Sequence, residues 1–379
     1  MSINEKNTAD QFCKFINHGL VYNKNTEGLV ISPCCYFSKN DYLDIEQDIN
    51  RQIEQRRQAW SKEDWNQTCK ICLDLEKSGQ HSYRQSSYDV IQDDVDGVAF
   101  LTVAVNKQCN LACASCGPGS SSFWYQQNLR DRIQQPSKII NLHREDRLEK
   151  DTKKFLSIFK DRAFKDLRYI KFGGGEPLMS STHADILETI NDPSLVTIQY
   201  TSNFSIEPST RIYDLWSKFK LVKWCASLDG VEDQFELLRW PYRWHDLEDF
   251  VSRVRNQVPH NVIFGVEHTL NPLNVWYIDR FRAWFRETLA TNRYGDPSDF
   301  NLHLCIGDMS FDQTPPDLRE KIRSKYGPHD PVVRLLDLTP YTGSYSNLLS
   351  WADYLDSRRQ TNWRHTFAEI SSFFLGNHL

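Results

Sequence analysis

Short apolar runs alternate with longer amphipathic stretches from about residue 100 onward. Six of these runs are expected to be strands, at 99–105, 167–172, 196–202, 221–228, 261–269 and 300–306. A helical period of apolar positions marks stretches between them, such as 144–161 and 182–191. Strands separated by helices of this length are typical of βαβ units, so the pattern predicts an α/β fold with a parallel sheet. Six strands suit an open, partial barrel, because a closed barrel of this type needs eight.

The first 90 or so residues follow another pattern. A hairpin is expected at 20–35 and a polar helix at 44–60, and the core they could form is thin. Five cysteines fall in this part, so a bound metal would help to hold it together. We therefore expect a small cysteine-bearing module over 1–92, an α/β domain over 93–300 and a C-terminal covering segment over 301–379.

Composition and charge bear on the environment in which the cysteines function. The 379 residues carry a formal net charge of -5, which gives no basic field for nucleic acid or an anionic membrane. The start of the sequence has no apolar signal region, and no run approaches the roughly 18 apolar residues of a membrane span. These features predict a cytoplasmic, reducing environment. There, the ten cysteines are better explained as metal ligands than as disulfides.

Three cysteines follow the first predicted strand of the α/β part. Cys109, Cys113 and Cys116 have the spacing Cys-x3-Cys-x2-Cys. A structural zinc site would need a fourth ligand nearby, whereas a [4Fe–4S] cluster held by three cysteines keeps one iron open. Their loop would lie at the carboxyl edge of the sheet, where parallel α/β sheets bind ligands. Spacing alone leaves zinc, or unrelated thiols, as alternatives.

A glycine-rich turn, "FGGGEP" at 172–177, ends the next predicted strand at the same edge. It has neither the Gly-Lys-Ser/Thr of a P-loop nor the glycine spacing of a dinucleotide site. Glycines let the backbone approach a ligand closely, and Glu176 could accept a hydrogen bond from an ammonium group.

Taken together with "SLDG" at 227–230, these motifs closely resemble the radical S-adenosylmethionine (SAM) superfamily over about 100–271. The resemblance implies a partial (β/α)6 barrel. It implies that Cys109, Cys113 and Cys116 hold a [4Fe–4S] cluster whose open iron takes the amino and carboxylate groups of SAM. Further SAM contacts are implied for Gly174, Gly175 and Glu176 at the amino group, and for Ser227 at the ribose or methionyl part.

Other SAM contacts rest on the same resemblance. Asp229 shares a strand face with Ser227. Arg239, twelve residues beyond that serine, is placed to pair with the SAM carboxylate, with a surface salt bridge as the alternative. Ser202 and Asn203 occupy a ribose-facing position, and 268–271 lies where the family packs adenine. The family's aromatic residue before the third cysteine is replaced by Ser115, so adenine packing must come from elsewhere. The run 123–125 is a candidate, with core packing as the alternative.

The N-terminal cysteines form a second metal-ligand pattern. Cys13, Cys34, Cys69 and Cys72 would suit a zinc site on physical grounds. Their order, with Gly28 ahead of Cys34, also resembles the twitch module, a shortened relative of the SPASM domain that carries an auxiliary [4Fe–4S] cluster. That module usually follows the radical SAM domain, and here it precedes it. Cys34 is the preferred ligand and Cys35 the alternative, and four cysteines would favour electron transfer over substrate binding.

The implied chemistry is reductive cleavage of SAM to a 5′-deoxyadenosyl radical, which abstracts a hydrogen atom. An external one-electron reductant of the flavodoxin or ferredoxin type would be needed. We expect an oxidoreductase that modifies a ribosomally made peptide by cross-linking, dehydrogenation or epimerisation. The alternatives are dehydrogenation of a small alcohol or sugar, and a non-catalytic metal-binding protein. Only twelve residues precede Cys13, which weakens the peptide reading because no leader-binding domain fits there.

Two side chains are catalytic candidates on their strand positions, Cys305 and Glu267. A thiol at Cys305 could return a hydrogen atom to a substrate radical, although a small buried packing residue is the alternative. The stretch 351–359 is expected to be an amphipathic helix without a site role.

Overall fold

The computed structural model describes residues 13–24, 29–39, 41–42, 44, 47–77, 81–92, 95–104, 106–143, 165–290 and 300–374. Within these ranges, no helix has the length and apolar character needed to cross a bilayer. The predicted helix at 144–161 and Gly28 both lie outside the described residues.

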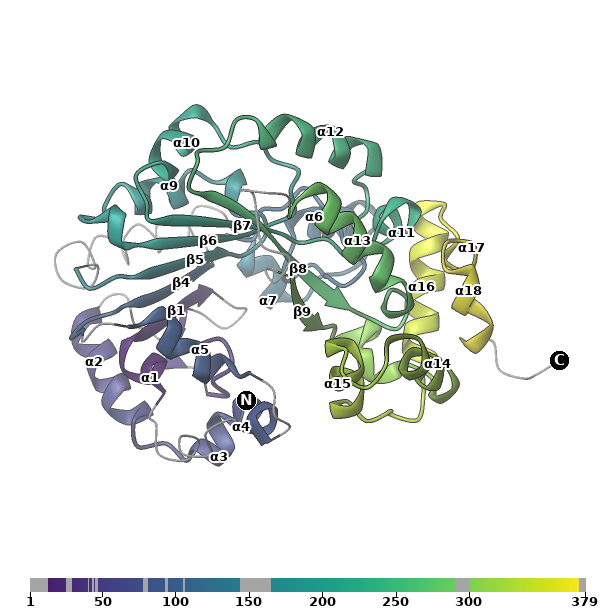
Figure 1. The fold of residues 1–379 in the computed structure, drawn as a ribbon, viewed down its shortest axis with the longest axis horizontal. Coiled ribbons are helices and arrows are strands. Elements are labelled where there is room, and N and C mark those ends of the chain that lie inside the picture. Colours follow the sequence, from purple (N-terminus) through teal and green to yellow (C-terminus); the bar gives the residue numbers. More distant parts are fainter. Residues whose placement is uncertain are drawn as a thin grey trace. The chain divides into compact units, whose positions relative to one another are not determined.

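The chain, whose helices and strands are labelled in Figure 1, divides into two compact units. Unit 1 comprises 1–107, 136–200 and 214–222, and unit 2 comprises 108–135, 201–213 and 223–379. These bounds differ from the expected limits at 92 and 300, because the N-terminal residues join the sheet of unit 1. The assignment of functional domains to 1–92, 93–300 and 301–379 stays a prediction.

The sheet of unit 1 combines the predicted hairpin with predicted parallel strands. Its order is β3-β2-β1-β4-β5-β6. The strands are β1 (Gly19–Lys24), β2 (Leu29–Ser32), β3 (Asp41–Tyr42), β4 (Phe100–Ala104), β5 (Tyr169–Gly173) and β6 (Thr197–Ser202), the last of which ends in unit 2. Strands β1 and β2 are antiparallel, as expected for a hairpin. Strand β1 pairs in parallel with β4, which pairs in parallel with β5, and β5 pairs in parallel with β6.

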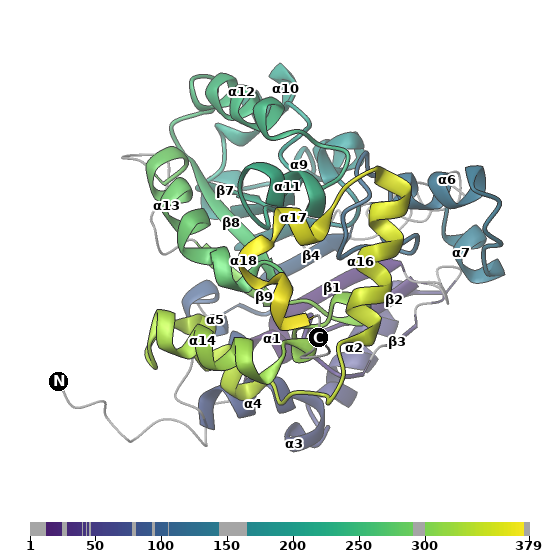
Figure 2. The ribbon, with the colours of Figure 1, turned by 90° about the vertical axis from the view of Figure 1, so that its right-hand side faces the viewer.

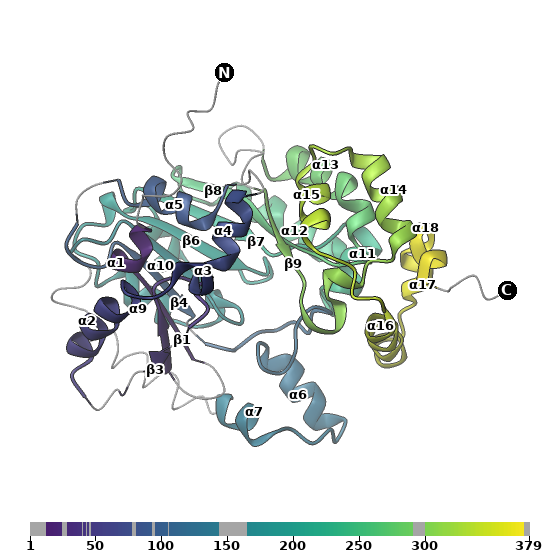
Figure 3. The same ribbon diagram turned by 90° about the horizontal axis from the view of Figure 1, so that it is seen from below.

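The helices of the N-terminal part, labelled in Figure 3, are α1 (Lys14–His18), α2 (Ile49–Trp60), α3 (Trp65–Thr68), α4 (Lys70–Lys77) and α5 (Tyr83–Val90). Among them, α1 contacts β1, α2 and α5. Helix α5 begins with a capping box, in which the Ser82 and Gln85 side chains each bond the other's backbone N–H. A buried ion pair between Arg84 of α5 and Glu76 of α4 joins these two helices. The remainder of unit 1 includes α7 (Ser137–Leu142), η1 (Pro177–Met179), α9 (Thr182–Leu187) and η2 (Pro193–Leu195).

Like β6, α10 (Thr210–Trp216) and β7 (Leu221–Ala226) have residues in both units. In unit 2, β7 is followed by β8 (Val262–Leu270) and β9 (Phe300–Leu304), and β8 and β9 are parallel. The predicted parallel α/β sheet is therefore confirmed. Each of β4 to β9 overlaps its predicted strand, β1 and β2 overlap the predicted hairpin, and β3 was not predicted. The partial-barrel curvature and the twitch module stay predictions.

Helices supply most of the apolar core of unit 2. They are α6 (Ser122–Arg130), α11 (Glu232–Leu238), α12 (Trp244–Arg255), α13 (Ile278–Thr288), α14 (Pro316–Tyr326), α15 (Pro331–Leu338), α16 (Ser346–Arg359), α17 (Trp363–Thr366) and α18 (Ala368–Ser371), with the short turns η3 (Val275–Tyr277), η5 (Gly307–Met309), η6 (Phe311–Gln313) and η7 (Ser372–Phe374). Figure 2 shows α16, α17 and α18 in succession at the end of the chain. Their core cluster includes Trp124, Leu238, Leu348 and Trp363. The cysteine loop that precedes α6 contributes Ala112 and Ala114 to the same cluster.

Candidate metal and cofactor site

The loop that carries the three clustered cysteines is held by its backbone. The amides of Ala112 and Ala114 donate to the carbonyls of Trp240 and Leu238, each at 2.8 Å. At the far end of the loop, Ser121 caps α6 and its hydroxyl also donates to the Leu111 carbonyl at 2.6 Å. The thiols therefore project from a backbone whose conformation is fixed by unit 2 itself.

The pKa values of Cys113 and Cys116 shift in opposite directions. The pKa of Cys113 is lowered to about 6, first because Cys116 donates a hydrogen bond to it and also because Arg239 lies nearby, against the opposing effect of burial. The pKa of Cys116 is raised well above its ordinary value by that same hydrogen bond and by burial. Cys109 adds to this rise through its charge. A thiolate at Cys113 is the form that binds metal.

Nitrogen donors are directed at two of the sulfurs. Arg239 Nη1 donates to Cys113 Sγ at 3.7 Å, and Asn203 Nδ2 donates to Cys109 Sγ at 3.8 Å. Hydrogen bonds to thiolate sulfur stabilise the deprotonated form and tune any iron bound to it.

Arg239 and Asp229 form a buried ion pair, with Nε and Oδ2 at 2.7 Å. Asp229 Oδ1 also accepts from the Thr269 amide at 2.8 Å, which ties the pair to the end of β8. Burial acts to lower the pKa of Arg239, but Asp229 and the two nearby thiols outweigh it and raise the pKa. The alternative of a surface salt bridge is wrong, because both side chains are buried.

The predicted ribose-facing residues lie beside the cysteine loop. Asn203 Nδ2 donates to Asn110 Oδ1 at 2.9 Å, and its Oδ1 accepts from the Ser205 hydroxyl at 2.6 Å. The Ser202 carbonyl accepts from the Ser227 amide at 2.7 Å, so the ends of β6 and β7 meet here. Unit 2 therefore brings together the three cysteines, Asn203 and Arg239 with its partner Asp229.

The glycine-rich turn belongs to unit 1. Gly174 has a φ of 119°, which side-chain-bearing residues rarely adopt. The Gly175 amide donates to the Asn106 carbonyl at 2.8 Å, and this bond ties the turn to the segment after β4. Glu176 is buried, and its Oε1 accepts from the Leu178 amide at 3.1 Å, which caps η1.

The stretch 268–271, at the end of β8, was expected near adenine, and two of its side chains make contacts within the protein. His268 is buried and packs against the rings of Phe281 and Phe300, with centroids at 5.0 and 5.9 Å, and its Nδ1 lies 2.9 Å from the Leu228 carbonyl. Burial lowers the pKa of His268 to about 4, so the ring is neutral. The Asn271 Oδ1 accepts from the amides of Leu273 and Asn274, which gives it a role in the turn.

Of the two catalytic candidates, Glu267 lies on β8 and Cys305 directly follows β9. Glu267 of β8 is buried and contacts His303 Nε2 of β9. Sequence reasoning missed His303, although it lies two residues before Cys305 on the same predicted strand. Burial raises the pKa of Cys305 to about 12, so the sulfur keeps its hydrogen at neutral pH.

The aromatic run after the cysteines is mostly structural. Trp124 is buried, and its indole stacks on Trp351 with centroids at 5.6 Å. Phe123 meets the Trp240 ring edge-on at 5.8 Å. These contacts favour the core-packing alternative for both.

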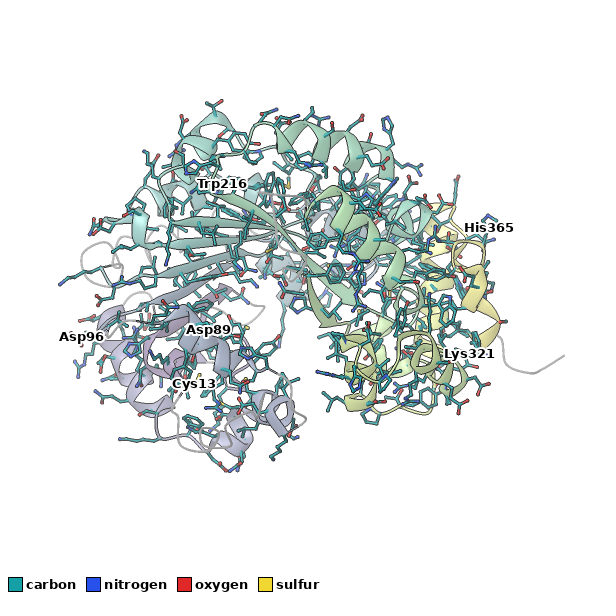
Figure 4. All side chains as sticks on the ribbon, viewed as in Figure 1. Cys13, Asp89, Asp96, Trp216, Lys321 and His365 are labelled. Atoms are coloured by element: carbon teal, nitrogen blue, oxygen red, sulfur yellow. The ribbon has the colours of Figure 1, made fainter. Side chains whose placement is uncertain are left out.

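The N-terminal cysteines lie in unit 1, with Cys13 at the start of α1 (Figure 4). Cys13, Cys34, Cys69 and Cys72 are buried, whereas Cys35 is exposed. Burial raises the pKa of Cys13 to about 11, and Cys69 and Cys72 add to this rise, so the three thiols lie within electrostatic range of one another. Burial also raises the pKa of Cys34, and Cys35, Cys13 and Cys72 contribute.

All ten cysteines are among the described residues, and none forms a disulfide. Within the described ranges, no three His, Cys, Asp or Glu side chains converge as the ligands of one metal ion. A four-iron cluster distributes its thiolates over different irons, so its ligands need not converge on one point.

No known family profile matches the sequence, and no curated protein is similar to it. Among solved structures, "Native anSMEcpe with bound AdoMet" is similar at 14% identity and a TM-score of 0.40, over 64% of this chain and 62% of that one. SuiB of Streptococcus suis bound to precursor peptide SuiA is similar at 12% identity and a TM-score of 0.39, over 82% of this chain and 68% of that one. This chain thus spans less than two thirds of the first protein. With TM-scores below 0.5, these likenesses carry no argument here.

Proposed function

We propose that this chain is a radical SAM enzyme that binds a [4Fe–4S] cluster at Cys109, Cys113 and Cys116. The observation that carries the proposal is the geometry of this loop: nitrogen donors face two of its three sulfurs, and the pKa of Cys113 is lowered although that of Cys116 is raised. Hydrogen bonds from nitrogen donors stabilise a thiolate more than a neutral thiol. The donor set therefore fits a thiolate-bound cluster.

The cluster and SAM, when bound, supply reductive SAM cleavage and hydrogen-atom abstraction. The protein's own part is to hold three thiolates at fixed positions and to place charged groups beside them. Asn203 and Arg239 bond Cys109 and Cys113, and Asp229 orients Arg239. We assign the SAM amino group to Gly174, Gly175 and Glu176, and the rest of SAM to Ser202, Ser227 and Arg239, by resemblance to the superfamily.

The N-terminal cysteines are proposed to hold an auxiliary [4Fe–4S] cluster. Cys13, Cys34, Cys69 and Cys72 are buried together, which separates them from the exposed Cys35. Burial raises the pKa of Cys13 and Cys72, and backbone amides of Phe15, Ile16, Tyr83 and Arg84 oppose this rise without outweighing it. Four cysteine ligands support a role in electron transfer, with zinc as the alternative occupant.

For the substrate, we propose a ribosomally made peptide that is modified oxidatively. The support is the expected oxidative role of a fully ligated second cluster, and a small alcohol or sugar is the alternative. Cys305, which keeps its hydrogen at neutral pH, and Glu267, paired with His303, are the proposed hydrogen-handling groups.

The test is SAM cleavage without substrate. Anaerobically reconstituted protein with dithionite should release 5′-deoxyadenosine and methionine, and Cys113→Ala should abolish this release. Cys305→Ala should retain it, because Cys305 is assigned to the substrate and not to the cluster. Release that is equal in wild type and Cys113→Ala, or absent from iron-loaded wild type, would overturn the proposal.

A further inference from the structure

Arg359, the last residue of α16, reaches the cysteine loop across 247 positions of sequence. Its Nη2 donates to the Ala112 carbonyl at 2.6 Å, and its Nη1 donates to the Leu237 carbonyl at 3.5 Å. The residue is 8% exposed. The stretch 351–359 is thus helical as expected, but it contacts the site, contrary to the sequence-based prediction.

Three successive carbonyls of the loop each accept a hydrogen bond from a side chain. Ala112 is bonded by Arg359, Cys113 by Trp124 Nε1 at 2.9 Å, and Ala114 by Trp351 Nε1 at 2.9 Å. Two of these three donors belong to α16. Since the Ala112 and Ala114 amides are also bonded, the backbone around Cys113 is fixed on both sides.

The Arg359 guanidinium brings a buried positive charge to this loop. It lies over the rings of Trp124 and Trp240, at 5.0 and 5.1 Å from their centroids. Among the described residues it forms no ion pair with a carboxylate. A buried charge without a counter-ion is costly, and such a group is normally paired or neutralised.

The thiolate loop is one source of compensating charge for Arg359, and Asp356, on the same helix, is another. Burial lowers the pKa of Arg359 to about 10, and Cys113 opposes this effect more strongly than any other group. Arg239 also donates a hydrogen bond to the Cys113 Sγ. Two buried cations therefore lie beside the middle cysteine of the motif.

We propose that Arg359 is a positioning residue that locks the Cys109–Cys116 loop from α16 and supplies a positive charge to the cluster held there. This rests on the proposed function, since it assumes a cluster at these cysteines. Residues that orient metal ligands typically matter by about 10- to 100-fold in metal affinity. A nearby positive charge stabilises the reduced, more negative cluster, so losing it lowers the reduction potential.

The experiment compares Arg359→Met, Arg359→Lys and Arg358→Met in the reconstituted full-length protein. Arg358 lies next to Arg359 on α16, is also near the Trp124 ring, and pairs with Asp131 and Asn128 instead of the loop. The readouts are the rate of iron loss to a chelator and the reduction potential from an EPR-monitored titration. Circular dichroism establishes that each variant is folded, and the cluster signal is assigned by its loss in Cys113→Ala.

Arg359→Met should lose iron about 10-fold faster than wild type or more, and its cluster should have a lower potential. Arg359→Lys should keep the potential but lose iron faster, because an ammonium lacks the planar fork that spans two carbonyls. Arg358→Met should match wild type. Folded Arg359 variants that match Arg358→Met in both readouts would overturn this inference alone. Wild type without iron at these cysteines would overturn the proposed function and this inference with it.

Discussion

Arg239 holds two partners at once, the Asp229 carboxylate through Nε and the Cys113 sulfur through Nη1. Its spacing from Ser227 singled it out in the sequence, but spacing says nothing about a partner from another strand end. The carboxylate fixes the direction in which the guanidinium presents its other donors. At this scale, Asp229 acts on the cysteine loop through Arg239.

Asp229→Asn should destabilise the fold strongly, because it leaves the buried Arg239 cation without its carboxylate. We expect the free energy of unfolding to fall by about 3–5 kcal/mol, the range for one broken buried pair. Urea denaturation measures this. Asp337→Asn is the matched control, since Asp337 pairs with Arg323 in an exposed position and such pairs contribute about 0–1 kcal/mol. Equal losses in the two variants would contradict a structural role for the Asp229–Arg239 pair.

A second prediction concerns the adjacent residues Cys34 and Cys35, which differ in exposure. Cys34 is buried with the other N-terminal thiols, and Cys35 is exposed. Iron analysis should find Cys34→Ser deficient by about four irons per chain, the content of one auxiliary cluster, with Cys35→Ser unchanged. The reverse pattern would assign the ligand to Cys35, and no loss in either variant would remove this position from the site.

At the scale of elements, the α13–α15 contact shows one residue serving two functions. Asp330 caps α15 by accepting from the Val332 amide at 2.8 Å, and it pairs with Arg282 of α13 at 2.7 Å.

Replacing Asp330 in two ways separates these contributions. Asp330→Asn keeps a side chain that can cap the helix, whereas Asp330→Ala loses both the cap and the pair. Thermal or urea unfolding should show Asp330→Ala less stable than Asp330→Asn by about 1 kcal/mol, the usual value of an N-cap. Indistinguishable variants would mean that the cap contributes nothing.

The elements themselves were largely predictable from the sequence. Apolar runs gave β4 to β9 because strands buried between helices need continuous apolar residues. The parallel pairing of β1 with β4 was not predictable, since a hairpin pattern does not reveal which neighbour its first strand joins.

His303 and Arg359 were missed for a similar reason: each acts through a contact made far along the chain, to Glu267 and to Ala112. Spacing motifs detect cysteines that are close in sequence, and they do not detect such partners.

For the whole molecule, the buried His268 links stability to pH. Its folded-state pKa is about 4, below the ordinary value of 6.5, so the unfolded chain binds the proton more tightly. The stabilisation is therefore fully present above pH 6.5 and is lost as pH falls toward 4, by about 1.4 kcal/mol per pH unit.

Chemical denaturation between pH 4 and 7.5 tests this linkage. Wild type should lose stability more steeply than His268→Gln as the pH falls from 6.5 toward 4, by up to about 1.4 kcal/mol per unit. Other groups, such as His18 with its lowered pKa, contribute equally to both curves. Parallel curves for the two proteins would contradict the assignment of this slope to His268.

The metal content of the whole chain is the most direct test of the central claim. Iron, sulfide and zinc should be measured after anaerobic reconstitution, with Mössbauer spectra of wild type and of a variant in which Cys109, Cys113 and Cys116 are all alanine. We predict about eight irons per chain in wild type and about four in the variant, as two [4Fe–4S] clusters require. The same iron content in both proteins, or zinc in place of iron at these three cysteines, would contradict the account.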